Sequence, residues 1–407
     1  MCVLLNFPEV ALILANKRIA NDESIRPVVY GVGLYFLLAG LDCFNIGSVG
    51  SMLKLVSFIP LFLVFLDLRK LQIRFSAVLV FQLLLWLLTI VSLFYSISVT
   101  KTSTLIKTLT LNLILVFALG AMEQYNQREL QFMQDALFAG GWIVIILMLL
   151  LSDVSKDGRL ILALGGKTSD PNYINGYFLY TFSYHCNRML QQDKKIHIIP
   201  MIFILAVVLL TGSRGALVAF TIALFAHLCV NFSRTKHTIR NVVLTALIIV
   251  VLFGAFDLIL EWMPENVAQR FSWDFIAEHG TTGRTGIWQF FLQHFSEDSI
   301  LRMLFGHGYG TAVLVNTVRH SGAHNLYIED LINLGVVGLL LELATQVSVL
   351  RVFIKYRQYS LLGAYFGMIG MCLSLGLTNY KPIWNITMLA LATDFYEKST
   401  HRSTTSF

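Results

Sequence analysis

A short polar interruption, Thr211–Gly215, splits a long aliphatic stretch of the sequence. Two glycines and two hydroxyl residues precede a new apolar run, so Thr211 and Ser213 can cap a helix that begins there. A helix start offers free N–H donors and positive dipole potential, both of which favour phosphate. Arg214 adds a guanidinium that can hold two phosphate oxygens at once. The pattern indicates a phosphate-binding helix start. The alternative, an arginine that only snorkels to the membrane surface, needs neither the glycines nor the hydroxyls.

A second arginine, Arg284, stands in the run Gly283–Trp288, ahead of aromatic residues at helical spacing. This spacing predicts an amphipathic helix on the outer membrane surface, with an apolar face of Ile287, Phe290, Phe291 and Phe295. Arg284 at its start is a further candidate phosphate ligand, and Arg270 is a weaker one. The alternative for both is a solvated loop arginine.

A third polar region combines the glycine-rich run Gly306–Gly310 with His324, which directly precedes a long apolar segment. The glycines allow tight turns or close approach to a ligand. A histidine at a membrane–water boundary can act as a general base near neutral pH, or it can simply cap the helix or anchor the interface. The neighbouring pair Glu329 and Asp330 could hold a proton or orient His324, although a polar helix face is the simpler interpretation.

Several metal and nucleotide chemistries are disfavoured by the sequence. His320 and His324 have HxxxH spacing, but Ser321 stands where a zinc protease carries glutamate, and Gly322 disfavours the helix. There is no DxD pair, no phosphate-binding GxxxxGK[ST] loop and no GxSxG nucleophile turn. We therefore expect neither a metal nor a cofactor.

The composition predicts an integral membrane protein. Of the 407 residues, 56% are hydrophobic and only 13% charged, and the mean hydropathy is +0.69. A typical soluble domain has about twice that share of charged residues. The net charge of +6 lies mainly in short clusters between apolar segments, which sets membrane orientation and gives no support to a nucleic-acid partner. The five cysteines are scattered in or beside apolar segments and predict no disulfide framework.

Segments long enough to span a bilayer recur along the chain, and we predict an all-α polytopic fold with about twelve of them. The predicted spans are 28–46, 49–67, 74–96, 104–122, 134–151, 172–190, 197–212, 214–232, 241–260, 326–350, 360–378 and 382–396. Basic loops near 69–74, 188–195, 234–240 and 351–357 should be cytoplasmic by the positive-inside rule.

This orientation divides the chain into four parts. They are an interfacial segment 1–27, nine spans in 28–261, an extracytoplasmic loop 262–325 with the amphipathic helix, and three spans with a cytoplasmic tail in 326–407. The loop between Ser152 and Pro171 and the turn at 212–215 then also face outward, on the same side as His324.

Taken in order, these motifs resemble the O-antigen polymerase and O-antigen ligase superfamily of bacterial surface polysaccharide synthesis. The resemblance rests on Leu209–Gly215, on Gly283 and Arg284 with Trp288, on Gly306–Gly310, and on Ala323–Asn325 before a glycine-broken helix. The run Asp170-Pro171-Asn172 is also similar to an outer-loop signature of the family.

The resemblance implies a GT-C-like, metal-independent, inverting glycosyltransferase in the bacterial cytoplasmic membrane. Its donor would be an oligosaccharide on undecaprenyl diphosphate, and transfer to a saccharide acceptor would occur on the extracytoplasmic side. Arg214 and Arg284 match the arginines that grip the diphosphate, and His324 matches the residue that activates the acceptor. We also expect substrate contacts from five further residues, namely Arg270, Ser213, Asn325, Asp170 and Asn172.

The resemblance leaves the acceptor open. A polymerase extends another lipid-linked repeat unit of O-antigen, capsule or exopolysaccharide, whereas a ligase transfers the polymer to the core sugars of lipid A. The Asp170–Tyr173 run is more similar to polymerases, whose expected partners include a flippase and a chain-length regulator. A lipid-linked oligosaccharide flippase or secondary transporter is the alternative from another class, although polar residues gathered at one face fit a carrier poorly.

Overall fold

The computed structural model describes residues 24–43, 45–46, 50–66, 72–155, 157–164, 167–234, 260–272, 275, 284–316 and 321–404. Five features predicted from the sequence lie wholly or largely outside these residues. They are residues 1–23 of the interfacial segment, the basic loop 234–240 after residue 234, the span 241–260 up to residue 259, Gly283 and His320.

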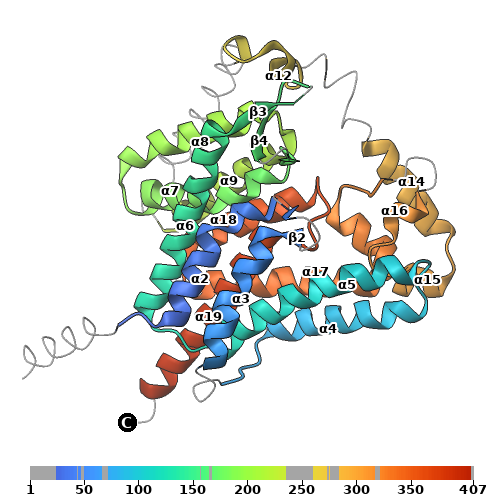
Figure 1. Cartoon of the computed structure of the whole chain (residues 1–407), viewed down its shortest axis with the longest axis horizontal. Coiled ribbons are helices and arrows are strands. Elements are labelled where there is room, and N and C mark those ends of the chain that lie inside the picture. The colour runs from blue at the N-terminus through green and yellow to red at the C-terminus, as the bar shows by residue number, and fades with distance from the viewer. Residues whose placement is uncertain are drawn as a thin grey trace, which may run out of the picture.

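The described chain is a bundle of helices (Figure 1). Its first half contains α2 (Pro27–Leu37), α3 (Met52–Leu66), α4 (Ala77–Val91), α5 (Val99–Val116) and α6 (Gln127–Leu150). The next helices are α7 (Leu179–Gln191), α8 (Ile198–Leu210) and α9 (Arg214–Arg234). Four short helices follow, namely α12 (Glu265–Gln269), α14 (Arg284–Glu297), α15 (Ile300–Phe305) and α16 (Ala312–Val315). The chain ends with α17 (Leu326–Lys355), α18 (Tyr359–Cys372) and α19 (Lys381–Thr404).

A helix falls in every predicted span except 241–260, which the structure hardly describes. Five of the described helical segments are long and apolar enough to cross a membrane, namely Ala77–Phe94, Val99–Met122, Gln127–Leu150, Arg214–Phe232 and Leu326–Lys355. Shorter apolar helices occur at Pro27–Leu37, Met52–Leu66, Lys195–Leu210 and Tyr359–Cys372. The chain is therefore a multi-pass membrane protein, while the total of about twelve spans remains a prediction.

Helices far apart in sequence pack against one another. α9 packs against α18, α17 against α4, and α2 against both α3 and α6. Small residues permit this approach, as at Gly140, where an added Cβ would lie 2.4 Å from the carbonyl oxygen of Phe36. Such close packing, more than apolar burial, drives helix association in lipid. The outward face of α3 exposes Phe58, Phe62 and Phe65, which we expect to contact lipid.

The described chain is mostly helical, in agreement with the all-α prediction, and two small antiparallel sheets occur in its loops. β3 (Ser152–Val154), β4 (Leu160–Leu164) and β5 (Lys167–Thr168) form one sheet, with Ser152 opposite Leu162 and Ala163 opposite Thr168. β1 (Asn45–Ile46) and β2 (Gly50–Ser51) form the other. Strands this short leave no usable alternation of apolar and polar residues, so the sequence alone could not reveal them.

In Figure 1 strands β3 and β4 and helix α12 lie at the top of the molecule and helices α14–α16 at its right, and we call these segments, together with the turn 211–213, the site end. The last turns of α19 lie on the opposite side of the molecule, at the lower left of Figure 1. The interruption predicted in α17 is confirmed at Gly335, which has a φ of 69°. A Cβ there would lie 2.3 Å from the backbone of Leu304, and one on Gly306 would lie 2.4 Å from that of Asn333. The two glycines therefore let α15 seat directly on the break in α17.

The orientation of the bundle can be tested by cysteine labelling. Ser299 lies exposed at the site end, and Lys194 lies exposed in a loop predicted to be cytoplasmic. In a background without the five native cysteines, an impermeant maleimide added to intact cells should label Ser299→Cys and miss Lys194→Cys. Labelling of both positions after permeabilisation checks that each cysteine is reactive. The opposite pattern would place the site end in the cytoplasm.

Candidate functional site

The turn between α8 and α9 forms the centre of the site end. Gly212 has a φ of 60°, a left-handed conformation that glycine adopts without strain. The hydroxyl of Ser213 accepts a hydrogen bond from the Ala216 N–H at 3.3 Å and so caps α9, as predicted. The hydroxyl of Thr211, also predicted as a cap, instead donates to the carbonyl of Val208 at 2.6 Å. The Thr211 hydroxyl therefore bonds to the end of α8, and only the Ser213 hydroxyl caps the start of α9, the helix that carries Arg214.

An arginine that the sequence did not single out, Arg159, binds this turn. Its Nε donates to the Thr211 carbonyl at 2.7 Å, and its Nη2 donates to Oδ1 of Asn172 at 2.9 Å. On the other side of the turn, Nε of Arg270 donates to the Gly212 carbonyl at 3.1 Å. A Cβ on Gly212 would lie 3.2 Å from Arg159 and 3.3 Å from Arg270. Glycine is thus needed for the two arginines to flank the turn.

Arg214 and Arg284 join this pair, so that four arginines form one group, which we call the arginine cluster: Arg159, Arg214, Arg270 and Arg284. Arg214 begins α9 and feels the charges of Arg270 and Arg284. Its guanidinium lies 5.8 Å from the centre of the Phe275 ring. The fold therefore brings together the three predicted arginines, Arg214, Arg270 and Arg284, and adds Arg159, which lies more than a hundred residues before Arg284.

The charges of the cluster oppose one another. Burial, together with the nearby Arg270 and Arg284, lowers the pKa of Arg159 to about 10. Burial also lowers the pKa of Arg284, with a smaller contribution from Arg270. Within the described part of the chain, neither Arg159, Arg270 nor Arg284 forms an ion pair. A bound anion would relieve this repulsion, which is why the arrangement favours an anionic ligand.

Asp170 is an acidic residue whose negative charge acts on several residues of the site. It acts on Arg159, Arg284 and His324. Its Oδ1 accepts the backbone N–H of Asn172 at 2.7 Å, which fixes the turn that presents Asn172 to Arg159. Both residues expected from the outer-loop run therefore lie at the cluster.

His324 is brought to the cluster by α14. Nε1 of Trp288, one helical turn beyond Arg284, donates to the carbonyl of Ala323 at 2.8 Å. Ile287 and Phe291 are buried in a small core that includes Ala323. The predicted helix over this segment is confirmed as α14. Its apolar side chains pack against protein next to the start of α17. That α14 also lies on the membrane surface remains a prediction.

The imidazole of His324 is exposed, with the backbone at a φ of 49°. Partial loss of hydration and the charge of Arg284 lower its pKa, against the opposing effect of Asp170. The ring is therefore neutral at neutral pH. Oε1 of Glu329 accepts the backbone N–H of His324 at 3.1 Å, so Glu329 fixes the position of the main chain. Asp330 is 2% exposed and points into the bundle, which corrects the interpretation of this pair as a polar helix face.

Two predicted substrate contacts already have structural roles. Oδ1 of Asn325 caps α17 by accepting the N–H groups of Tyr327 and Ile328, and its Nδ2 donates to the Leu373 carbonyl. Ser213 is 1% exposed and occupied as the cap of α9. Their contact with a substrate therefore remains a prediction.

The glycines of 306–310 approach protein rather than an open site, since a Cβ on Gly308 would lie 2.4 Å from the Ser96 hydroxyl.

Comparison with protein families bears directly on this site. Residues 199–343 match the family described as O-antigen ligase. The matched region begins in α8 and ends in α17, and it includes Arg214, Arg270, Arg284 and His324. A search of curated proteins found no match. The match over residues 199–343 supports the resemblance to the O-antigen polymerase and ligase superfamily that was predicted from the sequence.

Proposed function

We propose that the chain is an inverting glycosyltransferase that moves a saccharide from undecaprenyl diphosphate to a saccharide hydroxyl without a metal. The family match supports polymerase- or ligase-type function in general. The observation that carries the finer proposal is the arginine cluster beside a neutral histidine. Four guanidinium groups supply the charge for a diphosphate, and the exposed imidazole supplies a proton acceptor.

The reaction is a single displacement at the anomeric carbon. The acceptor hydroxyl oxygen forms the new bond to that carbon, and the bond from the carbon to the diphosphate oxygen breaks. The bonding pair leaves with the diphosphate, where Arg214 and Arg284 neutralise the growing charge. The hydroxyl proton passes to a ring nitrogen of His324. Attack opposite the leaving group inverts the configuration at the carbon.

The similarity of the Asp170–Tyr173 run to polymerases favours a polymerase, and its Asn172 lies beside Arg159, where the donor would bind in either reaction. In that case the acceptor is a second lipid-linked repeat unit. The ligase reaction, with lipid A core sugars as the acceptor, is the second candidate because the matching family is described as O-antigen ligase. Both reactions use the same arginines and histidine.

Purified protein supplied with one donor and either acceptor separates these candidates. A polymerase gives lipid-linked chains with a ladder of repeat units and needs no lipid A core. A ligase gives one glycosylated lipid A product and no ladder. Free undecaprenyl diphosphate accumulates in both cases. An intact donor recovered in full from both mixtures supports a flippase or transporter and contradicts the proposal.

If His324 is the general base, the rate should fall at low pH, where the imidazole is protonated. Because the pKa of His324 is lowered from its ordinary value of 6.5, the rate should be constant around pH 7 and fall at a midpoint below 6.5. Asp170→Asn removes a charge that raises this pKa, so the midpoint should move to lower pH. Initial rates at fixed ionic strength test both statements. If the pH midpoint is the same in Asp170→Asn as in wild type, the fall in rate at low pH is caused by the titration of another group.

A further inference from the structure

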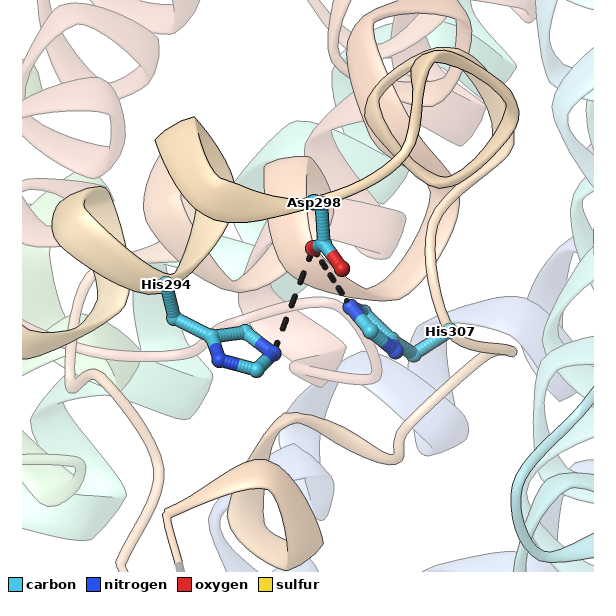
Figure 2. A group of neighbouring side chains, drawn as sticks. All are labelled: His294, Asp298 and His307. Carbon is cyan, nitrogen blue, oxygen red and sulfur yellow. Dashed lines mark hydrogen bonds and ion pairs between the residues drawn. The ribbon is translucent and has the colours of Figure 1, made fainter.

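A second group of polar side chains lies away from the arginine cluster, at the far end of α14 (Figure 2). His294 belongs to the last turn of α14, Asp298 follows the end of this helix, and His307 belongs to the glycine-rich loop after α15. One ligand atom from each residue lies within 4.8 Å of the other two. The helical distance from Arg284 to His294 is about 15 Å at the usual rise per residue.

The imidazoles of His294 and His307 both face one carboxylate oxygen, Oδ2 of Asp298. Nε2 of His307 lies 2.8 Å from it, and Nε2 of His294 lies 3.9 Å from it. The longer separation exceeds a hydrogen bond. Nε2 of His294 is buried and has no hydrogen-bond partner, although buried ring nitrogens normally have one. The group therefore holds a nitrogen lone pair or N–H that the protein itself does not satisfy.

We propose that His294, Asp298 and His307 bind a divalent transition metal ion, with Zn²⁺ as the best fit. Two imidazoles and one carboxylate form a common ligand set for zinc, with a fourth position left for water. The side chain of His294 is 37% exposed, whereas those of Asp298 and His307 are 14% and 10% exposed. His294 is therefore the most exposed of the three side chains, while its Nε2 atom is buried within the group.

Arg302 is the neighbouring charge that the site must accommodate. Its Nη1 lies 3.5 Å from Nδ1 of His307, and it also lies 3.4 Å from the Tyr95 carbonyl and 3.5 Å from the Gly306 carbonyl. Binding of a metal at Nε2 of His307 moves the ring proton to Nδ1. The guanidinium then keeps its two carbonyl partners, and the Asp298 carboxylate offsets part of the added charge.

The ion would act as a clamp within the segment that positions Arg284. It joins the end of α14 to the loop that begins at Gly306, and this loop is hydrogen-bonded to α17 through the N–H of His307 and the Ile332 carbonyl at 2.9 Å. The same helix holds Arg284 at its other end. The ion would therefore help to hold the helix that carries Arg284, without contacting the reacting groups.

Cobalt binding tests the clamp without any saccharide. Full-length protein in detergent is stripped with EDTA, desalted and titrated with Co²⁺ while the visible spectrum is recorded. Wild type should develop an intense ligand-field band that saturates at one equivalent and is displaced by Zn²⁺. His294→Ala and Asp298→Asn should lose the band and the rise in Tm that Zn²⁺ produces in wild type.

Glu297→Gln is the matched control. This residue is exposed, adjoins Asp298 and accepts a hydrogen bond from Gln293, so the same loss of a carboxylate occurs outside the group. It should keep both the band and the shift in Tm. Asp298→Asn retains an acceptor for His307, and a single symmetrical gel-filtration peak confirms that each variant is folded. A folded wild type without the band, or a band that survives in His294→Ala, overturns the proposal and leaves only a hydrogen-bonded His–Asp–His group.

Discussion

Arg214→Ala and Arg284→Ala should each lower the rate of undecaprenyl diphosphate release by about 10³-fold or more. Arginines that stabilise a phosphate group in a transition state are worth about 10³–10⁵ in rate. Both residues carry the charge that a departing diphosphate needs, and among the described residues no group of three or more His, Cys, Asp or Glu side chains close enough to share one ion lies at the cluster. Release is measured as the initial rate with purified variants at saturating donor.

Lysine at either position should recover only part of the loss. An ammonium restores the charge but not the planar pair of donors that holds two phosphate oxygens. Arg351→Ala is a suitable control, since Arg351 is an exposed arginine towards the far end of α17 from His324, and it should leave the rate unchanged. If Arg214→Ala and Arg284→Ala both turn over at a near-normal rate, these arginines do not stabilise the leaving diphosphate and the proposed mechanism is wrong.

His324→Ala should lower the rate by about 10²–10⁴-fold, the usual range for general-base assistance. Donor binding should persist, because the arginines remain in place. The backbone N–H of His324, which donates to Glu329, is retained in the variant, so the start of α17 should stay intact. Binding of the lipid donor and the rate are measured on the same preparation.

His324→Gln separates proton removal from orientation of the acceptor. Glutamine can hydrogen-bond the hydroxyl but cannot accept its proton at neutral pH. We expect it to be almost as slow as alanine. A rate close to wild type in His324→Gln would show that orientation of the hydroxyl suffices. A rate close to wild type in His324→Ala would mean that another group, such as the carboxylate of Asp170, is the general base.

The candidate site residues could be predicted from the sequence where a motif marks them. Arg214 follows a capped glycine turn, Arg284 begins an aromatic helix, and His324 begins a long apolar one. Arg159 was missed because Asp157, Gly158 and Arg159 have the composition of an ordinary solvated turn. Its role depends on the Thr211 carbonyl, 52 residues away, and only tertiary packing shows this.

The environment of each residue was harder to predict than its type. Asp330 follows Glu329 on the same helix, yet one side chain holds a backbone N–H at the site end and the other is buried in the bundle. The apolar face of α14 is compatible with lipid or with protein, and periodicity alone does not distinguish them. The group of His294, Asp298 and His307 was missed because its third member comes from a loop nine residues beyond the second.

Turnover after exhaustive chelation is the most direct test that arginines, and not a metal, hold the diphosphate. Purified wild type is treated with EDTA, and release of undecaprenyl diphosphate from the lipid-linked donor is followed. We predict that release continues and that added Mg²⁺, which prefers phosphate and carboxylate oxygen ligands, does not increase it. An effect of Zn²⁺ alone would point to the clamp at His294. If release stops in EDTA and Mg²⁺ restores it, a metal binds the diphosphate and the proposed mechanism is wrong.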